Sequence, residues 1–230
     1  VGRSIRNKPY RNSKIRYLRW DFRSFEKPNL LFLKKTDVII NCIGKTDNSL
    51  NDLENINVNF IRELLRYISI YKLKVRFLHL SSVAVYGGAE NYLNQSKIIT
   101  ENTTTKTNDL YSKSKLKGDM LIKDTIKKNL SKNLSFTILR ISNVFGKKKN
   151  SNLYRFVMFT LKFGFWIKTS NEIMHNFVHV KDVSQAVSLI ISKLKVSRNK
   201  TYIVSDDFKQ YELYDAYQKF YKKKIMNILF

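Results

Sequence analysis

The sequence predicts an α/β protein with a doubly wound parallel sheet, covered by helices on both faces in a three-layer αβα arrangement. Short apolar runs alternate with longer stretches that repeat apolar residues at helical spacing, as in successive βαβ units. Right-handed crossovers of such units place helices on both faces of the sheet. With two prolines and seven glycines the chain shows no obvious linker, so we expect one domain over residues 1–230, less regular after about residue 147.

Each expected element follows from its local pattern. Strands are predicted for the apolar runs 14–21, 37–44, 74–82, 135–142, 176–180 and 201–206. The continuous run 37–44 predicts a strand that is buried on both faces. Helices are predicted for residues 53–72, 109–130, 152–164, 181–194 and 211–223. The first of these carries apolar residues at helical spacing, at Ile56, Phe60, Leu64 and Ile68.

The chain is strongly basic, with 43 Lys and Arg against 18 Asp and Glu and a net charge of +25. One interpretation is a surface that binds nucleic acid or acidic membranes. The other is a compositional bias, because Lys, Asn and Ile are frequent throughout and the basic residues are scattered. Tight clusters occur only at Lys147–Lys149 and Lys222–Lys224, which favours the second interpretation. Under either one, the charge favours anionic small ligands.

A single cysteine, Cys42, excludes a disulfide framework and favours a reducing compartment. No apolar run reaches the length of a membrane span. We therefore expect a cytoplasmic protein without a membrane-spanning segment.

Polar or small residues follow three of the expected strands, at Asn41–Gly44, Ser81–Ser82 and Ser142–Asn143. In a doubly wound sheet, ligands bind at the carboxyl ends of the strands. We expect the functional site where these three strand ends meet.

Tyr111 and Lys115 are four residues apart in the expected helix 109–130, so they share one face of it. A tyrosine hydroxyl has a pKa of about 10, and a nearby ammonium group lowers it by favouring the phenolate. The same lysine could bind ribose hydroxyls of a cofactor. The spacing alone also occurs by chance on many helices, so the pair needs support from its surroundings.

Several ordered segments supply that support: LHLSSVAVYGG (78–88), the Tyr111–Lys115 pair, LRISNVFG (139–146) and NFVHVKDVSQAV (176–187). In this order they resemble the extended short-chain dehydrogenase/reductase family, in its NAD-dependent epimerase/dehydratase branch. The resemblance covers nearly the whole chain. It implies a Rossmann-like fold and an enzyme that uses NAD or NADP, in most cases on nucleotide sugars.

The resemblance also implies catalytic roles. Tyr111 matches the general acid/base for a sugar hydroxyl, and Lys115 matches its lysine partner. Ser82 matches the residue that hydrogen-bonds the reacting sugar oxygen. A different role for Ser82, as the cap of a helix or turn, stays open.

Further positions match contacts to cofactor or substrate. The implied cofactor contacts are Asp21 and Phe22 at the adenine ring, Cys42, Ile43 and Gly44 along the cofactor backbone, Asn57 near the ribose and the lysine, and Ser142 at the nicotinamide end. Asn143 would approach the phosphates of the substrate, and Asp182 would cap the helix that follows it.

Two departures from the family pattern are informative. The glycine-rich turn that receives the pyrophosphate is absent, and the start VGRS resembles the end of the family's second strand. We therefore expect a fragment that lacks the first βα unit and is also shortened at its C-terminus. Arg3 lies just past that second strand, where an arginine can hold the 2′-phosphate of NADP. Arg3 thus favours NADP, while NAD stays open.

Sugar 4,6-dehydratases of this family carry an Asp-Glu pair after the serine, but here Val83 and Ala84 follow. An epimerase, such as a UDP-sugar 4-epimerase, or a nucleotide-sugar 4-keto reductase is therefore expected. Its substrate would be bound by residues 147–230, and a homodimer is compatible with the family. A non-catalytic basic relative that binds nucleic acid is the third hypothesis.

Two of the histidines have the spacing of a metal-binding pair, but their surroundings do not support one. His175 and His179 are four apart, as in helical metal sites, but they lie in or beside the strand 176–180 and no third ligand is near. We expect no metal, and we expect His79 to be packed within its strand.

Overall fold

The structure is a computed structural model that describes residue 14 and residues 33–46, 50–87, 98–128, 133–146, 152–163, 165–168, 174–221 and 226–229. The expected strand 14–21, the expected cofactor residues Arg3, Asp21 and Phe22, and both lysine clusters lie outside this description, residue 14 apart. The chain forms two compact units. The first contains Val1–Leu139 and Ser197–Thr201, and the second contains Arg140–Val196 and Tyr202–Phe230.

Among the described residues, a four-stranded sheet has the order β1-β2-β3-β7, and the ends of β3 and β7 are assigned to the second unit. Its strands are β1 (Val38–Asn41), β2 (Val75–Ser82), β3 (Leu134–Ile141) and β7 (Lys200–Val204). All four were expected from the sequence. β1 is parallel to β2, and their register sets Asn41 opposite His79. This register brings together two polar residues that are 38 positions apart in the chain.

The prediction that the first of these strands is buried on both faces is wrong. Ile40, in β1, is 41% exposed. Within the described part of the chain β1 pairs with β2 alone, at the edge of the sheet. A strand at the edge of a sheet is covered less completely than a central strand, even when both consist of apolar residues.

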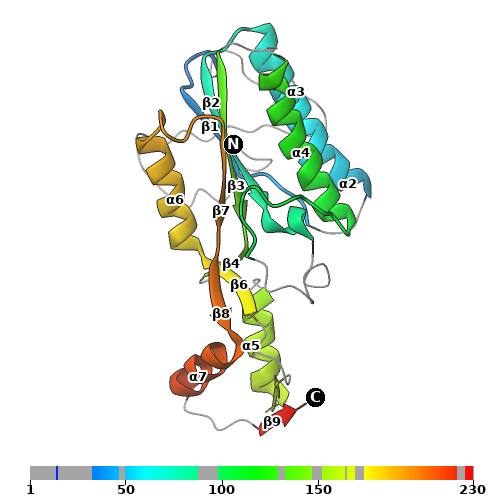
Figure 1. Cartoon of the computed structure of the whole chain (residues 1–230), viewed down its shortest axis with the longest axis vertical. Helices are drawn as coiled ribbons and strands as arrows, with labels where there is room; N and C mark the ends of the chain where they lie inside the picture. The colour runs from blue at the N-terminus through cyan, green and yellow to red at the C-terminus, as the bar shows by residue number, and fades with distance from the viewer. Residues whose placement is uncertain are drawn as a thin grey trace. The chain divides into compact units, whose positions relative to one another are not determined.

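The expected helix 53–72 exists but is not continuous. It consists of α2 (Leu50–Glu54), the π-helical turn η1 (Asn55–Asn59) and α3 (Phe60–Ile70). The second expected helix is α4 (Leu110–Lys127), which begins at a capping box. There, Ser112 N donates to Asp109 Oδ1 at 2.6 Å and Asp109 N donates to Ser112 Oγ at 3.2 Å. α2, α3 and α4 lie side by side on one face of the sheet (Figure 1).

These helices and strands enclose the core of the first unit. Its buried apolar cluster consists of Leu33, Phe60, Ile61, Leu64, Leu65, Ile68, Leu73, Val75, Phe77, Ile122, Leu134, Phe136 and Ile138. The apolar positions expected for helix 53–72 are all buried. Gly118 allows α4 to approach the π-helical turn, because a Cβ there would lie 2.9 Å from Asn57 O and 2.9 Å from Ile61 Cδ1.

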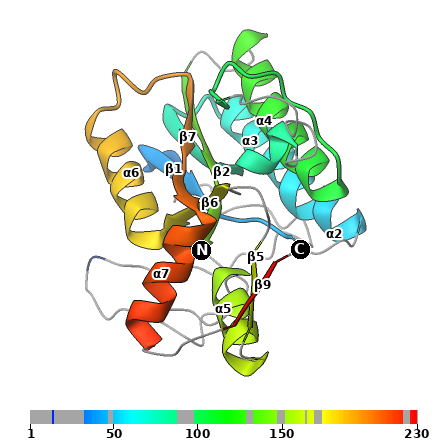
Figure 2. The same ribbon diagram turned by 60° about the horizontal axis from the view of Figure 1, so that its bottom comes forward.

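In its described residues, the second unit contains two small sheets and three helices. One sheet has the order β4-β6-β8, where β4 (Asn143–Phe145) is parallel and β8 (Asp206–Lys209) antiparallel to β6 (Met174–His179). β5 (Phe165–Lys168) pairs in parallel with β9 (Met226–Leu229), and Figure 2 shows this pair beside α5. The helices are α5 (Asn152–Phe163), α6 (Val180–Ser192) and α7 (Gln210–Tyr221). The helices and β6 were expected, whereas β4, β5, β8 and β9 were not.

No helix in the described ranges has both the length and the hydropathy that a membrane span requires.

Candidate active site

The structure brings Ser82 and Tyr111 together within the first unit. Ser82 is the last residue of β2, and Tyr111 stands in the first turn of α4. The Ser82 hydroxyl lies close enough to the Tyr111 phenol to lower its pKa. The capping box at Asp109 fixes the start of α4, so the backbone that carries Tyr111 is held at this strand end.

Ser82 also has the capping role that the sequence left open. Its Oγ accepts a hydrogen bond from Ala84 N at 3.2 Å and so caps the 3₁₀ turn η2 (Val83–Tyr86). A hydroxyl group can accept with its lone pairs and donate its one hydrogen at the same time. The two roles are therefore compatible: the cap orients Ser82, and its O–H can point toward Tyr111.

The pKa of Tyr111 is raised above its ordinary value, which is opposite to the expectation from the sequence. Burial is the main cause, the Ser82 hydroxyl lowers the pKa, and the Asp109 carboxylate raises it further. The ammonium group of Lys115 acts instead on Cys42 and His79. Its Nζ donates to Leu80 O, in β2, at 2.8 Å. Tyr111 is therefore protonated at neutral pH in this structure.

Lys115 is buried, with only 4% of its surface exposed. Burial lowers its pKa to about 8, while Asp119 and Cys42 raise it. At pH 7 most molecules therefore still carry the ammonium group. An ammonium group has three N–H donors, and the bond to Leu80 O uses one of them.

Asn57 connects the loop after β1 with α4. Its Oδ1 accepts from Lys45 N at 2.9 Å, and its Nδ2 donates to Lys45 O at 3.0 Å and to Ser114 Oγ at 2.9 Å. Ser114 Oγ in turn donates to Tyr111 O at 2.7 Å. These bonds hold the loop against the helix turn that carries the tyrosine. The cofactor contact expected of Asn57 stays a prediction.

The strand end at Cys42–Gly44 fits the dinucleotide that the sequence implies. A Cβ on Gly44 would lie 3.7 Å from Asn57 Oδ1 and 3.9 Å from Lys115 Nζ, so the glycine leaves the space beside the ammonium group open. The Cys42 side chain has exposed surface, but partial desolvation raises the pKa of its thiol, which therefore stays protonated and is a poor nucleophile. Ser81 Oγ is buried without a hydrogen-bond partner in the described protein, so this strand end has hydrogen-bonding capacity left for a polar ligand.

The other expected site residues belong to the second unit. Ser142 follows β3, and its backbone N donates to Val204 O at 3.1 Å, while its Oγ is buried without a partner among the described groups. Asn143 begins β4 and is exposed. Their contacts with cofactor and substrate stay predictions.

Two residues that interact with Lys115, His79 and Asp119, were not assigned a functional role from the sequence. Asn41 was expected at the site, within the strand end Asn41–Gly44, but its bond to His79 was not. Asp119 lies one helical turn beyond Lys115 on the same face of α4, and this spacing was the available signal. His79 was expected to be packed, and it is 1% exposed, but its ring has polar partners that no sequence pattern indicates.

The histidine pair considered for a metal site belongs to the second unit. His175 and His179 lie on β6, and the described residues contain no group of three or more His, Cys, Asp or Glu that could hold a metal ion. The prediction that Asp182 caps the following helix is wrong. His179 is the cap of α6 and accepts from Lys181 N at 3.3 Å, while Asp182 stands in the first turn.

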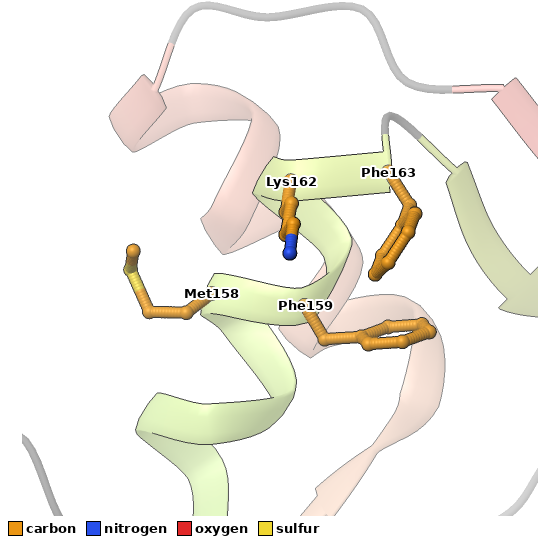
Figure 3. Close-up of a pocket in the computed structure, with 4 residues that line it drawn as sticks. All are labelled: Met158, Phe159, Lys162 and Phe163. Carbon is orange, nitrogen blue, oxygen red and sulfur yellow. The ribbon is translucent and has the colours of Figure 1, made fainter.

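A separate pocket in the second unit contains none of the expected site residues. It is lined by Met158, Phe159, Lys162 and Phe163 (Figure 3). All four come from neighbouring turns of α5, and the only polar group among them is the lysine. This pocket therefore has a mainly apolar lining with one basic group, Lys162.

Solved structures share this fold. UDP-glucuronic acid 4-epimerase from Bacillus cereus, in complex with NAD, is 17% identical with a TM-score of 0.77, over 95% of this chain and 70% of that one. dTDP-glucose 4,6-dehydratase from Bacillus anthracis, also with NAD, is 20% identical with a TM-score of 0.66, over 84% and 60%. RMD from Pseudomonas aeruginosa, complexed with NADPH, is 20% identical with a TM-score of 0.65, over 84% and 69%.

These likenesses confirm the predicted fold, a Rossmann-like parallel sheet with flanking helices. A comparison with curated proteins found no match. The family is shown by a family model, described as the NAD dependent epimerase/dehydratase family, which matches residues 3–205. The chain belongs to the NAD-dependent epimerase/dehydratase family of enzymes.

Proposed function

We propose that the protein is an NAD(P)-dependent nucleotide-sugar epimerase, such as a UDP-sugar 4-epimerase. The observation that carries this proposal is the position of Tyr111 beside Ser82 at the end of β2, one helical turn from the buried Lys115. Membership of the family supports the class of reaction. The likeness to the Bacillus cereus UDP-glucuronic acid 4-epimerase supports the class of substrate.

Residues of the first unit would hold NAD(P). Lys115 has two further N–H groups for ribose hydroxyls, and Gly44 keeps the space beside them open. Ile43 and Cys42 would line the same strand end, and Asn57 fixes its shape through Lys45. When bound, the cofactor supplies the acceptor and donor of hydride for a carbon of the sugar.

Tyr111 would exchange a proton with the hydroxyl group on that carbon, and Ser82 would donate a hydrogen bond to the same oxygen. The Ser82 hydroxyl is oriented for this by its bond from Ala84 N. Burial disfavours the phenolate of Tyr111. Tyr111 can therefore act as a base only if a positive charge stabilises its phenolate when cofactor and substrate are bound. Its action as an acid has no such requirement.

That difference favours one second candidate, an NADPH-dependent nucleotide-sugar 4-keto reductase. A protonated Tyr111 can directly give its proton to the oxygen of a ketone. Arg3, outside the described residues, favours NADP at the sequence level. The reductase uses the same residues as the epimerase and differs in the direction of the proton at Tyr111.

Dehydration is a poorer fit. Val83 and Ala84 form the start of the turn η2, where dehydratases of the family carry their acidic pair. Neither side chain can give or take a proton. The elimination of water would therefore lack its acid and base at this position.

The test uses the protein as its gene encodes it in full. Binding of NAD, NADP and NADPH is titrated, and a panel of UDP-, dTDP- and GDP-sugars is then followed by mass spectrometry and NMR. A sugar isomerised at constant mass supports the epimerase. A gain of two hydrogens with consumption of NADPH supports the reductase.

Failure to bind any of the cofactors would refute both the epimerase and the reductase function. The net charge of +25 would then favour the third hypothesis, a non-catalytic protein that binds nucleic acid. Such binding weakens steeply as salt increases, and a titration with RNA at two salt concentrations measures this.

A further inference from the structure

Four polar side chains are buried together behind the candidate site. Asn41 of β1, His79 of β2, and Lys115 and Asp119 of α4 are 3%, 1%, 4% and 1% exposed. Ionisable residues are rarely buried this completely unless they are paired. All four belong to the first unit, so their arrangement is fixed within one compact body.

The hydrogen bonds of Asn41 decide which nitrogen of His79 carries the proton. Ile43 N donates to Asn41 Oδ1 at 3.0 Å, which identifies the oxygen of the amide. Asn41 Nδ2 therefore donates to His79 Nδ1, 3.1 Å away. A nitrogen that accepts carries no hydrogen, so a neutral His79 holds its proton on Nε2.

His79 is neutral because it is completely buried and faces a positive charge. Burial and the Lys115 ammonium group both lower its pKa well below the ordinary value. Its Nε2 lies 3.8 Å from Asp119 Oδ1. This distance is too long for a hydrogen bond, but it sets the positive end of the N–H dipole beside the carboxylate.

Asp119 also acts on Lys115, one turn earlier in α4. Its negative charge raises the pKa of Lys115 and opposes the effect of burial. Lys115 interacts with ionisable groups on the elements around it: Cys42 after β1, His79 on β2, and Asp119 on its own helix. Of these, Asp119 is the one that supplies a carboxylate.

We propose that Asn41, His79 and Asp119 act as positioning residues for the lysine of the active site. Asn41 sets the tautomer of His79, the N–H of His79 favours the ionised Asp119, and Asp119 is the counter-charge that keeps Lys115 an ammonium group while it is buried. The catalytic meaning of this arrangement rests on the proposed function, but the arrangement itself does not.

The same residues link Lys115 to the expected cofactor loop. Asn41 Oδ1 accepts a hydrogen bond from Ile43 N, within the Cys42–Gly44 strand end, and Asn41 Nδ2 donates one to His79 Nδ1. A substitution at His79 should therefore affect both the protonation of Lys115 and the Cys42–Gly44 strand end.

The first test reads the tautomer of His79 directly. The chain has three histidines, at 79, 175 and 179, so long-range ¹H–¹⁵N spectra of histidine-labelled protein are assigned with three single variants. We expect the proton on Nε2 and a neutral ring from pH 8 down to pH 6. A proton on Nδ1, or a charged ring at pH 6, would overturn the proposal.

The second test measures the pKa of Lys115 from the ¹³Cε shift of labelled lysine. Asp119→Asn should lower this pKa by about one unit or more. The matched control is Asp124→Asn, the same change at an exposed position of the same helix, which should leave it unchanged. An unchanged Lys115 pKa in folded Asp119→Asn would overturn the proposal.

If Asp119→Asn does not fold, two changes at His79 take its place. His79→Gln keeps an N–H donor, and His79→Leu removes it. The proposal expects the Lys115 pKa to fall further in His79→Leu than in His79→Gln, and equal values would contradict it.

Activity separates this proposal from the proposed function. In the active protein, the alkaline limb of the pH profile of kcat should move downward in Asp119→Asn by the same amount as the Lys115 pKa. A fixed limb with a moved pKa would overturn the positioning role. A wild-type protein without sugar-nucleotide turnover, but with the expected NMR results, would refute the proposed function and leave the charge arrangement standing.

Discussion

The interiors of the two units differ in what they bury. The first encloses a continuous apolar cluster and, next to it, the polar residues around Lys115. In the second, the buried apolar side chains among those described are Ile141, Val178 and Ile190. Acid/base groups need a rigid, dry environment, and the first unit has that environment. The choice of substrate, which we expect in residues 147–230, places no such demand on a core.

The largest expected effect tests whether the chemistry resides in the first unit. Tyr111→Phe removes the proton donor and should lower kcat of the complete protein by about 10²–10⁴-fold. Steady-state kinetics on the sugar found active in the panel measure it. Tyr71→Phe, at a tyrosine that is 39% exposed at the end of α3, is the matched control and should have normal turnover. Normal turnover in Tyr111→Phe would show that the site lies elsewhere.

The second effect tests the difference in packing. Phe77, in the centre of the first core, is fully buried, and Phe77→Ala should lower the free energy of unfolding by about 3–5 kcal/mol. Leu189, in α6, is 55% exposed, and Leu189→Ala should change it by less than about 0.5 kcal/mol. Urea unfolding measures both. Similar losses at the two positions would mean that Leu189 is covered in solution, for example by a second copy of the chain.

A third effect concerns the cost of the buried ammonium group. The pKa of Lys115 is about 8 in the folded protein against 10.5 as its ordinary value, so the unfolded chain binds more protons between these pH values. Stability should therefore rise as pH increases from 8 to 10.5. Lys115→Met should be more stable than wild type by about 1–3 kcal/mol at pH 7, after the loss of the bond to Leu80 O, and the difference should shrink above pH 8.

Thermal unfolding at pH 7 and pH 10 compares the two proteins. Lys113→Met, on the same helix but exposed, is the control and should show no such pH dependence. If Lys115→Met is less stable than wild type at pH 7, the lysine stabilises the fold. The prediction that its burial lowers stability would then be wrong.

The smallest effect comes from His79. Its pKa is lowered by burial and by Lys115, so below pH 6.5 the unfolded chain takes up a proton that the folded protein resists. Stability from this group is present above pH 6.5 and is lost as pH falls below it. His79→Gln should show a smaller loss between pH 7 and pH 5 in urea unfolding, and His175→Gln, a change in the second unit, provides the comparison.

Much of the fold could be predicted because its signals are local. The strands of the first unit within the described residues and helices α4 to α7 follow from periodicity, as does the apolar face of α3. The short strands β4, β5, β8 and β9 could not be predicted, since three or four residues are too few to show a period. The π-helical turn at Asn57 was also missed, because apolar spacing continues through it and only the bonds to Lys45 and Ser114 distinguish it.

The sequence by itself determined the order of the longer elements, the family and the set of Ser82, Tyr111 and Lys115 as candidates, because these depend on residue identity and spacing along the chain. Only the tertiary structure decided the protonation of Tyr111, the lowered pKa of Lys115 and the bond from Asn41 to His79. Burial and strand register control these properties, and both arise from contacts between residues far apart in sequence. The chemistry of a buried charge is therefore set by neighbours that no local pattern identifies.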